Sequence, residues 1–277
     1  MSNPEVGQSI EANGITTNFH DQGSGPPVLL IHGSGPGVSA WANWRTTIPA
    51  LAERFRVLAP DMVGFGFTQR PRDVVYSLDT WVSHALGFMD ALGIEAASVV
   101  GNSYGGALAL AMAARAPQRV TRLVLMGSAG VSFPLTPGLE AAWGYQPSAA
   151  NMKALMGIFA YDQRLVTDEL AALRHQASLR PGVQEAFAAM FPAPRQRWIE
   201  ALTTPAERIL ALPQPTLIVH GREDRVIPLD NAYELLRLIP KAQLHVFGQC
   251  GHWTQIEHCA RFNRLVGDFL AEPAATS

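Results

Sequence analysis

A serine at position 103 stands in a sequence context that could make it a nucleophile. It is the centre of the pentapeptide GNSYG (residues 101–105), which follows an apolar pair (99–100) and precedes an Ala/Leu-rich helical stretch (107–116). The pattern G-x-S-x-G between a strand and a helix is the nucleophile elbow, a sharp turn that holds the serine hydroxyl clear of the sheet. Glycines flank the serine where strand and helix approach too closely for a Cβ. The alternative is a glycine-rich turn with an incidental serine, so the rest of the chain has to decide.

A nucleophilic serine needs a base within hydrogen-bond reach and an acid that orients that base. In folds that carry this elbow, the acid and then the base follow the serine in the chain, each after a strand. The strand-like run 216–219 is followed by Asp224, and the run 243–247 by His252. We therefore predict Ser103 as the nucleophile, His252 as the general base and Asp224 as the orienting acid.

Three other residues compete for these roles. Glu223 lies one step nearer its strand than Asp224, and Asp230 is expected to cap the next helix. His32 also follows a strand, but it precedes the serine and opens a glycine-rich loop.

That loop, residues 32–37 with the sequence HGSGPG, is expected to help hold an oxyanion. The backbone N–H of Tyr104 would supply one donor and a backbone N–H near Ser34 the second. As a phosphate cradle the loop is a weak candidate, because it lacks the Lys-Ser/Thr pair of a P-loop.

Strand-like and helical segments alternate along much of the chain. The expected strands are residues 15–20, 28–31, 56–59, 99–100, 122–126, 216–219 and 243–247, and the expected helices between and after them are 80–92, 107–116 and 260–270. Short continuous apolar runs are typical of strands that are buried on both faces. The alternation predicts a mostly parallel sheet with helices on both faces.

The alternation stops between residues 131 and 208. Helical segments (148–159, 168–179 and 183–190) are interrupted there by prolines, and Trp, Met and Phe are frequent. We predict a helical cap at residues 131–208, inserted after the sixth strand of a core domain formed by residues 1–130 and 209–277.

Composition excludes several classes of protein. A chain that is 48% apolar and 16% charged is not disordered, and a net charge of −2 without a basic run does not favour nucleic acid or an anionic membrane. The polar residues 1–14 do not resemble a signal peptide, and no apolar stretch reaches the length of a membrane span. We expect a cytoplasmic protein.

Neither a disulfide framework nor a metal site is expected. Cys250 and Cys259 are the only cysteines, and they lie near His252 and His258. Because His252 is assigned to the base, this cluster does not have the ligand spacing of a metal site. We therefore expect no metal and no organic cofactor.

Three longer stretches resemble the meta-cleavage product hydrolases, α/β-hydrolases that cleave carbon–carbon bonds in aromatic catabolism. They are HGSGPGVSAWANWR (32–45), PDMVGFG (60–66) and FGQCGHWTQ (247–255), and the resemblance covers essentially the whole chain. It implies the α/β-hydrolase fold. Ser34 stands where relatives that accept biphenyl-derived substrates tend to have glycine, which favours the monocyclic branch acting on 2-hydroxymuconate semialdehyde.

The resemblance implies a small-molecule substrate with a 2-hydroxy-6-oxo-2,4-dienoate skeleton, cleaved to 2-hydroxypenta-2,4-dienoate and a carboxylic acid. The enzyme would first move a proton to C5 and then break the C5–C6 bond. His252 suits both proton transfers, since imidazole titrates near neutral pH. Ser103 would either attack the C6 carbonyl or help to activate a water, and both roles remain open.

The same resemblance implies a set of substrate contacts, and we also expect a homo-oligomer. Arg174 would bind the substrate carboxylate, since an arginine fork matches a carboxylate, and Arg195 and Arg197 are its rivals. Trp253 would pack against the dienoate, although a core tryptophan is the alternative. The other implied contacts are Gly33, Asn43, Asn102, Trp143 and Val226.

Two other functions remain possible for a chain with these residues. A carboxylesterase would use the same three side chains. A ligand receptor on the same scaffold would not need them, so the presence of Ser103, Asp224 and His252 disfavours a receptor.

Overall fold

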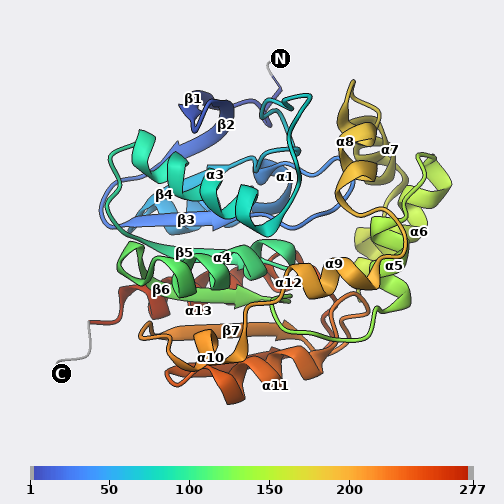
Figure 1. Cartoon of the computed structure of the whole chain (residues 1–277). Coiled ribbons are helices and arrows are strands. Elements are labelled where there is room, and N and C mark those ends of the chain that lie inside the picture. The colour runs from blue at the N-terminus through green and yellow to red at the C-terminus, as the bar shows by residue number, and fades with distance from the viewer. Residues whose placement is uncertain (1–2, 274–277) are drawn as a thin grey trace.

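An eight-stranded sheet runs through the computed structural model, which describes residues 3–273 (Figure 1). The strands are β1 (Gln8–Ala12), β2 (Ile15–Gln22), β3 (Pro27–Ile31), β4 (Arg56–Pro60), β5 (Ala97–Asn102), β6 (Val120–Met126), β7 (Thr216–Gly221) and β8 (Ala242–Phe247). Their spatial order is β1-β2-β4-β3-β5-β6-β7-β8; β1, β2 and β4 pair antiparallel, and every other pair is parallel. The predicted mostly parallel sheet is confirmed.

Helices cover both faces of the sheet because the central strands are apolar on both sides. In β5, Val99 packs into the core on one face and Val100 into the core on the other, as the two-residue period of a strand requires. One face is covered by α3 (Leu78–Ala91), α4 (Tyr104–Arg115), α10 (Ala206–Leu210) and α11 (Leu229–Leu238). The other is covered by α1 (Ala40–Trp44), α2 (Ile48–Ala52) and α13 (Cys259–Ala271), which follows the short α12 (Thr254–Glu257).

Each predicted strand core lies within an observed strand, and two differences have physical reasons. The sequence analysis does not predict β1, an exposed edge strand with the polar sequence QSIEA. Helix α4 begins at Tyr104, three residues before the predicted start, despite Gly105 and Gly106. A Cβ on either glycine would collide with β3 or with Ser128, so these glycines permit close packing and do not interrupt the helix.

Between β6 and β7 the chain is helical. It forms α5 (Pro137–Trp143), α6 (Ala149–Phe159), α7 (Asp168–Ser178), α8 (Val183–Met190), α9 (Gln196–Ala201) and α10, with a single 3₁₀ turn at Gln163–Leu165. Figure 1 shows α5–α8 grouped beyond one end of the sheet. Helix α10 spans the predicted boundary at residue 208 and packs against α4 and α11. The division into core and cap stays a prediction, and residues 1–2 and 274–277 of that core lie outside the described part.

No helix within residues 3–273 combines the length and the apolar character that crossing a bilayer requires.

A buried histidine on α3 ties the first strands to the loop after β4. His84 is 1% exposed; its Nδ1 accepts the Val63 N–H at 3.2 Å, so its Nε2–H donates to Thr17 Oγ1 at 2.8 Å. Burial, with a smaller effect of nearby His32, lowers the pKa of His84 from 6.5 to about 4. The ring is therefore neutral and holds one tautomer.

This histidine predicts a loss of stability in acid. Between pH 6.5 and about 4 the unfolded chain binds a proton at position 84 that the folded chain does not, so the free energy of unfolding falls as the pH falls. His84 contributes at most about 3 kcal/mol to this loss of the free energy of unfolding. Urea unfolding at pH 7 and pH 4.5 should show a smaller acid loss for His84→Gln, which does not titrate. An equal loss in both proteins would contradict the assignment.

Candidate active site

Ser103 stands at the turn between β5 and α4 in strained backbone. Its φ of +57° and ψ of −116° are rare for a residue with a side chain, and its N–H donates to the Met126 carbonyl at 2.8 Å. A Cβ on Gly101 would collide with the Gly105 carbonyl, and a Cβ on Gly105 with the carbonyl of Ile31. The close packing of β5, α4 and β3 therefore maintains the strain.

His252 and Asp224 form a hydrogen-bonded pair beside this serine. The His252 Nδ1 lies 2.7 Å from Asp224 Oδ2, while Asp224 Oδ1 accepts the N–H groups of Val226 at 2.7 Å and Ile227 at 3.0 Å. Burial, the largest single effect, raises the pKa of Asp224, but the charge of His252 and these hydrogen bonds outweigh it, and the pKa lies below its usual value. A charged Asp224 keeps the proton of His252 on Nδ1 and leaves Nε2 free to act as a base.

The two other acids do not reach His252. Glu223 accepts the Cys250 N–H at 2.9 Å and pairs with Arg222. Asp230 lies in the first turn of α11, whose N-cap is Pro228, so the expectation that Asp230 caps this helix is wrong. The helix begins at Leu229, one residue before Asp230. The charge of Asp230 is favourable near the helix N-terminus, but its side chain lies past the cap position.

The glycine-rich loop after β3 is fixed by its histidine. His32 Nε2 accepts the Met62 N–H at 2.9 Å, so Nδ1–H donates to the Gly33 carbonyl at 2.7 Å, and burial lowers the pKa of this ring. The Gly33 N–H donates to Asn43 Oδ1 at 3.2 Å. Since the Gly33 N–H is already bonded, the backbone N–H groups of Ser34 and Tyr104 are the donors available to an oxyanion.

Ser34 offers a further donor because of a tryptophan behind it. Trp143 Nε1 donates to Ser34 Oγ at 3.0 Å, and indole is a donor only, so the serine hydroxyl must direct its own proton elsewhere. Ser34 lines the cavity described below, whereas Trp143 does not line it and stacks on Phe191 at 4.3 Å. The Ser34 hydroxyl is therefore free to donate into the cavity.

Tyr104 directs its side chain away from the site. The ring packs edge-on against Trp81 at 4.9 Å and near Phe65 at 5.5 Å, fully within the core. Only the backbone of Tyr104 can serve the site.

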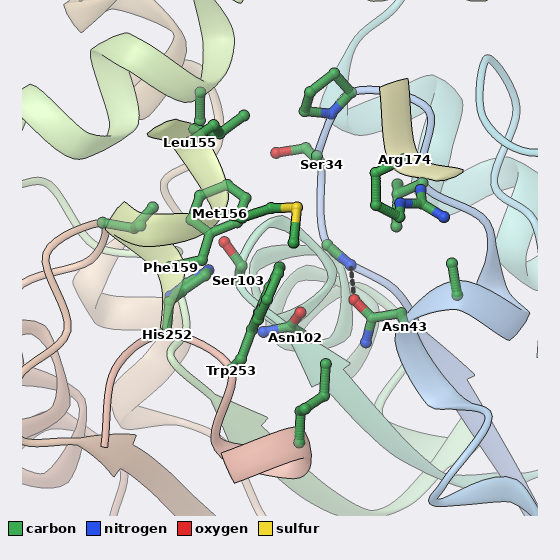
Figure 2. Close-up of a pocket in the computed structure, with 18 of the residues that line it drawn as sticks. Ser34, Asn43, Asn102, Ser103, Leu155, Met156, Phe159, Arg174, His252 and Trp253 are labelled. Carbon is green, nitrogen blue, oxygen red and sulfur yellow. Dashed lines mark hydrogen bonds between the residues drawn. The ribbon is translucent and has the colours of Figure 1, made fainter. Parts of the chain in front are cut away.

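One cavity joins these groups under α5–α7. Of the predicted residues it is lined by Gly33, Ser34, Asn43, Asn102, Ser103, Arg174, Val226, His252 and Trp253. Figure 2 shows apolar Leu155, Met156 and Phe159 on the side of Ser103 and His252, with Asn43 and Arg174 on the opposite side. The cavity thus has an apolar end, where the serine lies, and a polar, cationic end.

Several lining residues are not among the predicted contacts. Polar Arg45 directly follows α1 and polar Gln255 lies in α12, and the apolar ones include Met152, Leu155, Met156 and Phe159 of α6. The spacing of those four positions is helical and visible in the sequence, but it does not tell what the apolar face covers.

Arg174 is the one of the three candidate arginines that lines the cavity, and it already has an ionic partner. Its Nη2 donates to the Gly37 carbonyl at 2.6 Å, and its Nη1 lies 3.5 Å from a carboxylate oxygen of Glu5. Burial lowers the pKa of Arg174, and Glu5 opposes that effect. Arg195 pairs with Glu140, and Arg197 stacks on Trp198.

This arrangement can carry out acyl transfer. A serine in an elbow, a histidine with a free Nε2, a buried carboxylate and convergent N–H donors are the parts that such chemistry needs.

Comparison with known proteins agrees with this chemistry. The family model described as alpha/beta hydrolase fold matches residues 26–258. The chain is 62% identical over 277 residues to the 2-hydroxymuconate semialdehyde hydrolase of Pseudomonas sp. strain CF600, covering 100% of this chain and 98% of that protein. It is 60% identical to the 2-hydroxy-6-oxo-2,4-heptadienoate hydrolase of Pseudomonas putida, covering 97% and 98%. The solved meta-cleavage product hydrolase of Pseudomonas fluorescens, complexed with acetates, superposes with a TM-score of 0.96 at 62% identity, covering 96% and 98%.

The pairing of Asp224 with His252 predicts the effect of one isosteric change. Asp224→Asn replaces an acceptor by an amide, which no longer holds the proton on Nδ1, and turnover of a p-nitrophenyl ester should fall by about 10³- to 10⁴-fold. The midpoint of thermal unfolding serves as the control for folding. Turnover within a few-fold of the unsubstituted protein, at an unchanged midpoint, would show that Asp224 does not orient the base.

Proposed function

From the finding that this chain belongs to the α/β-hydrolase family, and within it to the meta-cleavage product hydrolases, we propose that it hydrolyses ring-fission products of catechols. The enzyme is a serine-dependent carbon–carbon bond hydrolase. Its substrates are 2-hydroxy-6-oxo-2,4-dienoates, either 2-hydroxymuconate semialdehyde or its 6-alkyl analogues. The products are 2-hydroxypenta-2,4-dienoate and a carboxylic acid. The observation that carries the proposal is the identity of 62% across the full length of a relative of that name.

The two ends of the cavity support a substrate of this shape. The cationic end with Arg174 and Asn43 suits the C1 carboxylate, and Asn102 also lines the cavity (Figure 2). The apolar end, formed by α6 with Leu139 of α5 and Val226, suits a hydrogen or small alkyl group on C6. Ser103 lies toward the apolar end, where C6 must come (Figure 2).

The first step is ketonisation of the dienol. Nε2 of His252 takes the proton of the 2-hydroxyl group, and the imidazolium that forms is stabilised by Asp224 at 2.7 Å. The proton is then delivered to C5. The result is a 2,6-diketone in which the C5–C6 bond can break, because the electrons left on C5 are delocalised into the 2-oxo group.

The second step is addition of an oxygen nucleophile to C6. The nucleophile is either Ser103 Oγ or a water that Ser103 helps to activate, and in both cases His252 takes its proton. The oxyanion on C6 would be held by the N–H groups of Ser34 and Tyr104 and by the Ser34 hydroxyl that Trp143 orients.

Collapse of this intermediate breaks the C5–C6 bond. The dienolate that leaves takes up a proton from His252. An acyl group on Ser103, if formed, is hydrolysed by water with His252 again as the base.

Other parts of the proposal concern the surroundings of the enzyme. Among residues 3–273 no group of three or more His, Cys, Asp or Glu side chains could hold a metal ion, and the mechanism above requires neither a metal nor a cofactor. Cys250 is buried and Cys259 is half-buried, both as free thiols, which supports a cytoplasmic location. The edge strand β8, which has an unpaired side in the described part of the chain and mostly half-buried residues, and half-exposed Tyr233 on the neighbouring α11 support a homo-oligomer.

The experiment that tests the function is a spectrophotometric turnover panel. The yellow dienoates with hydrogen, methyl or phenyl at C6 and a p-nitrophenyl ester are compared as substrates of the unsubstituted enzyme and of Ser103→Ala. We expect the hydrogen and methyl compounds to be preferred and the variant to lose several powers of ten in cleavage rate while it still binds the dienoate. Preference for the ester over every dienoate would indicate a carboxylesterase instead.

The ion pair between Arg174 and Glu5 leads to opposite predictions for substitutions of its two members. Arg174→Gln removes a charge-assisted contact with the C1 carboxylate. The loss of transition-state stabilisation should be roughly 2–5 kcal/mol, which lowers kcat/KM for the dienoate by about 30- to 5000-fold. Glu5→Gln releases Arg174 from its internal partner and should lower KM for the dienoate.

A neutral ester provides the control for both variants. It has no carboxylate, so its turnover should change much less in either of them. Equal losses on the dienoate and the ester in Arg174→Gln would indicate a displaced helix α7 and would leave Arg45 as the candidate cation.

A further inference from the structure

The carboxylate of Glu257 joins two segments of the chain that are far apart in sequence. Glu257 is the last residue of α12, and its Oε1 accepts the N–H of Gly251 at 2.7 Å. Its Oε2 accepts the N–H groups of Tyr161 and Asp162, both at 2.8 Å. One side chain thus connects the loop that carries His252 to the segment that follows α6.

The backbone of these two segments is also in direct contact. The N–H of His252 donates to the carbonyl of Phe159, the last residue of α6, at 2.7 Å. A Cβ on Gly251 would collide with that same carbonyl, so only glycine fits between the two segments. The position of the base therefore depends on where the end of α6 lies.

The end of α6 also forms the wall of the cavity. The Phe159 ring lines the cavity and lies 5.9 Å from the His252 ring and 5.6 Å from the Trp253 ring (Figure 2). A shift of this segment would displace the apolar wall and the base together. The side chain of Asp224 fixes only Nδ1 of His252, so the backbone contacts have to place the rest of the ring.

We propose that Glu257 is a positioning residue that locks the end of α6 to the His252 loop, so that the base reaches the reacting atoms only when this helix is seated. The inference rests on the proposed function in so far as His252 is the base. The side chain of Glu257 does not line the cavity and acts through Gly251 and His252.

The chemistry of the three hydrogen bonds selects the informative variant. A carboxylate presents acceptors on both oxygens, whereas glutamine has one acceptor and one donor group. In Glu257→Gln the amide must turn its NH₂ toward an N–H group, either that of Gly251 or those of Tyr161 and Asp162. The volume is kept and one of the two connections is broken.

Glu223 offers a matched control. It binds the same loop through the Cys250 N–H at 2.9 Å, but its other oxygen pairs with Arg222 and it makes no hydrogen bond to residues 159–162. Glu223→Gln therefore perturbs the His252 loop without releasing α6.

The test measures kcat and KM for a dienoate and for a p-nitrophenyl ester in the unsubstituted enzyme, Glu257→Gln and Glu223→Gln. A base displaced by less than 1 Å should lower kcat by about 10- to 100-fold on both substrates, with KM changed by no more than about threefold. Glu223→Gln should lose much less. A loss of the same size in both variants, or one confined to KM, would overturn the proposal.

Amide hydrogen exchange gives a readout that does not depend on activity. Glu257→Gln should lower, by about tenfold or more, the protection of the amides on the connection that breaks, either that of Gly251 or those of Tyr161 and Asp162, while Glu223→Gln leaves Tyr161 and Asp162 unchanged. Unchanged protection at all three amides would also overturn the proposal that Glu257 is a positioning residue. If the unsubstituted enzyme turned over the ester but no dienoate, the proposed function would fail, while the ester and exchange measurements would still decide the role of Glu257.

Discussion

The structure depends on the close approach of β5 and α4 at the turn that carries Ser103. No side chain fits at Gly101 or Gly105, and the serine between them is held at φ +57°. A cost of about 1–3 kcal/mol for such backbone is typical, and it is offset by the packing of the buried strands around it. Because β3, β5, β6, β7 and β8 run parallel, their carboxyl ends meet at one edge. The loop proposed to hold the oxyanion and the residues proposed as nucleophile, acid and base all follow strands of this set, which brings residues far apart in sequence together at one site.

Buried carboxylates that bind backbone N–H groups hold these loops in place. Asp224 binds the N–H groups of Val226 and Ile227, and Asp61, fully buried after β4, binds those of Ala40 at 2.6 Å and Phe67 at 2.7 Å. Asp61 thereby anchors the start of α1, directly after the oxyanion loop. Charge-assisted hydrogen bonds to N–H groups are stronger than neutral ones, and a buried charge is stable only when it is so paired. The acids that accept hydrogen bonds from the N–H groups of these loops therefore also make the loops rigid.

The sequence predicts the parts of this site that depend on local pattern and chain order. Strand cores are apolar, and the order of Ser103, Asp224 and His252 after successive strands follows from the parallel sheet, so these residues can be identified without coordinates. Contacts between distant surfaces cannot be identified in this way. Nothing in the sequence near Glu5 indicates that it would lie 3.5 Å from Arg174. The polar edge strand β1 and the short helices also lack a periodic signal long enough to detect, and Trp143 is expected at the substrate but lies behind Ser34.

The chemistry and the selection of the substrate are supplied by different parts of the chain. The proposed reacting groups come from loops at the sheet edge, and most of the apolar surface proposed to surround C6 comes from α6, whose side chains Met152, Leu155 and Met156 line the cavity. Helix α6 is tied to the base only at its end, through Phe159 and the carboxylate of Glu257. Side chains earlier in α6 can therefore change the size of the pocket for the C6 substituent without moving the backbone that holds His252. The arrangement separates what must stay fixed for proton transfer from what can vary with the substrate.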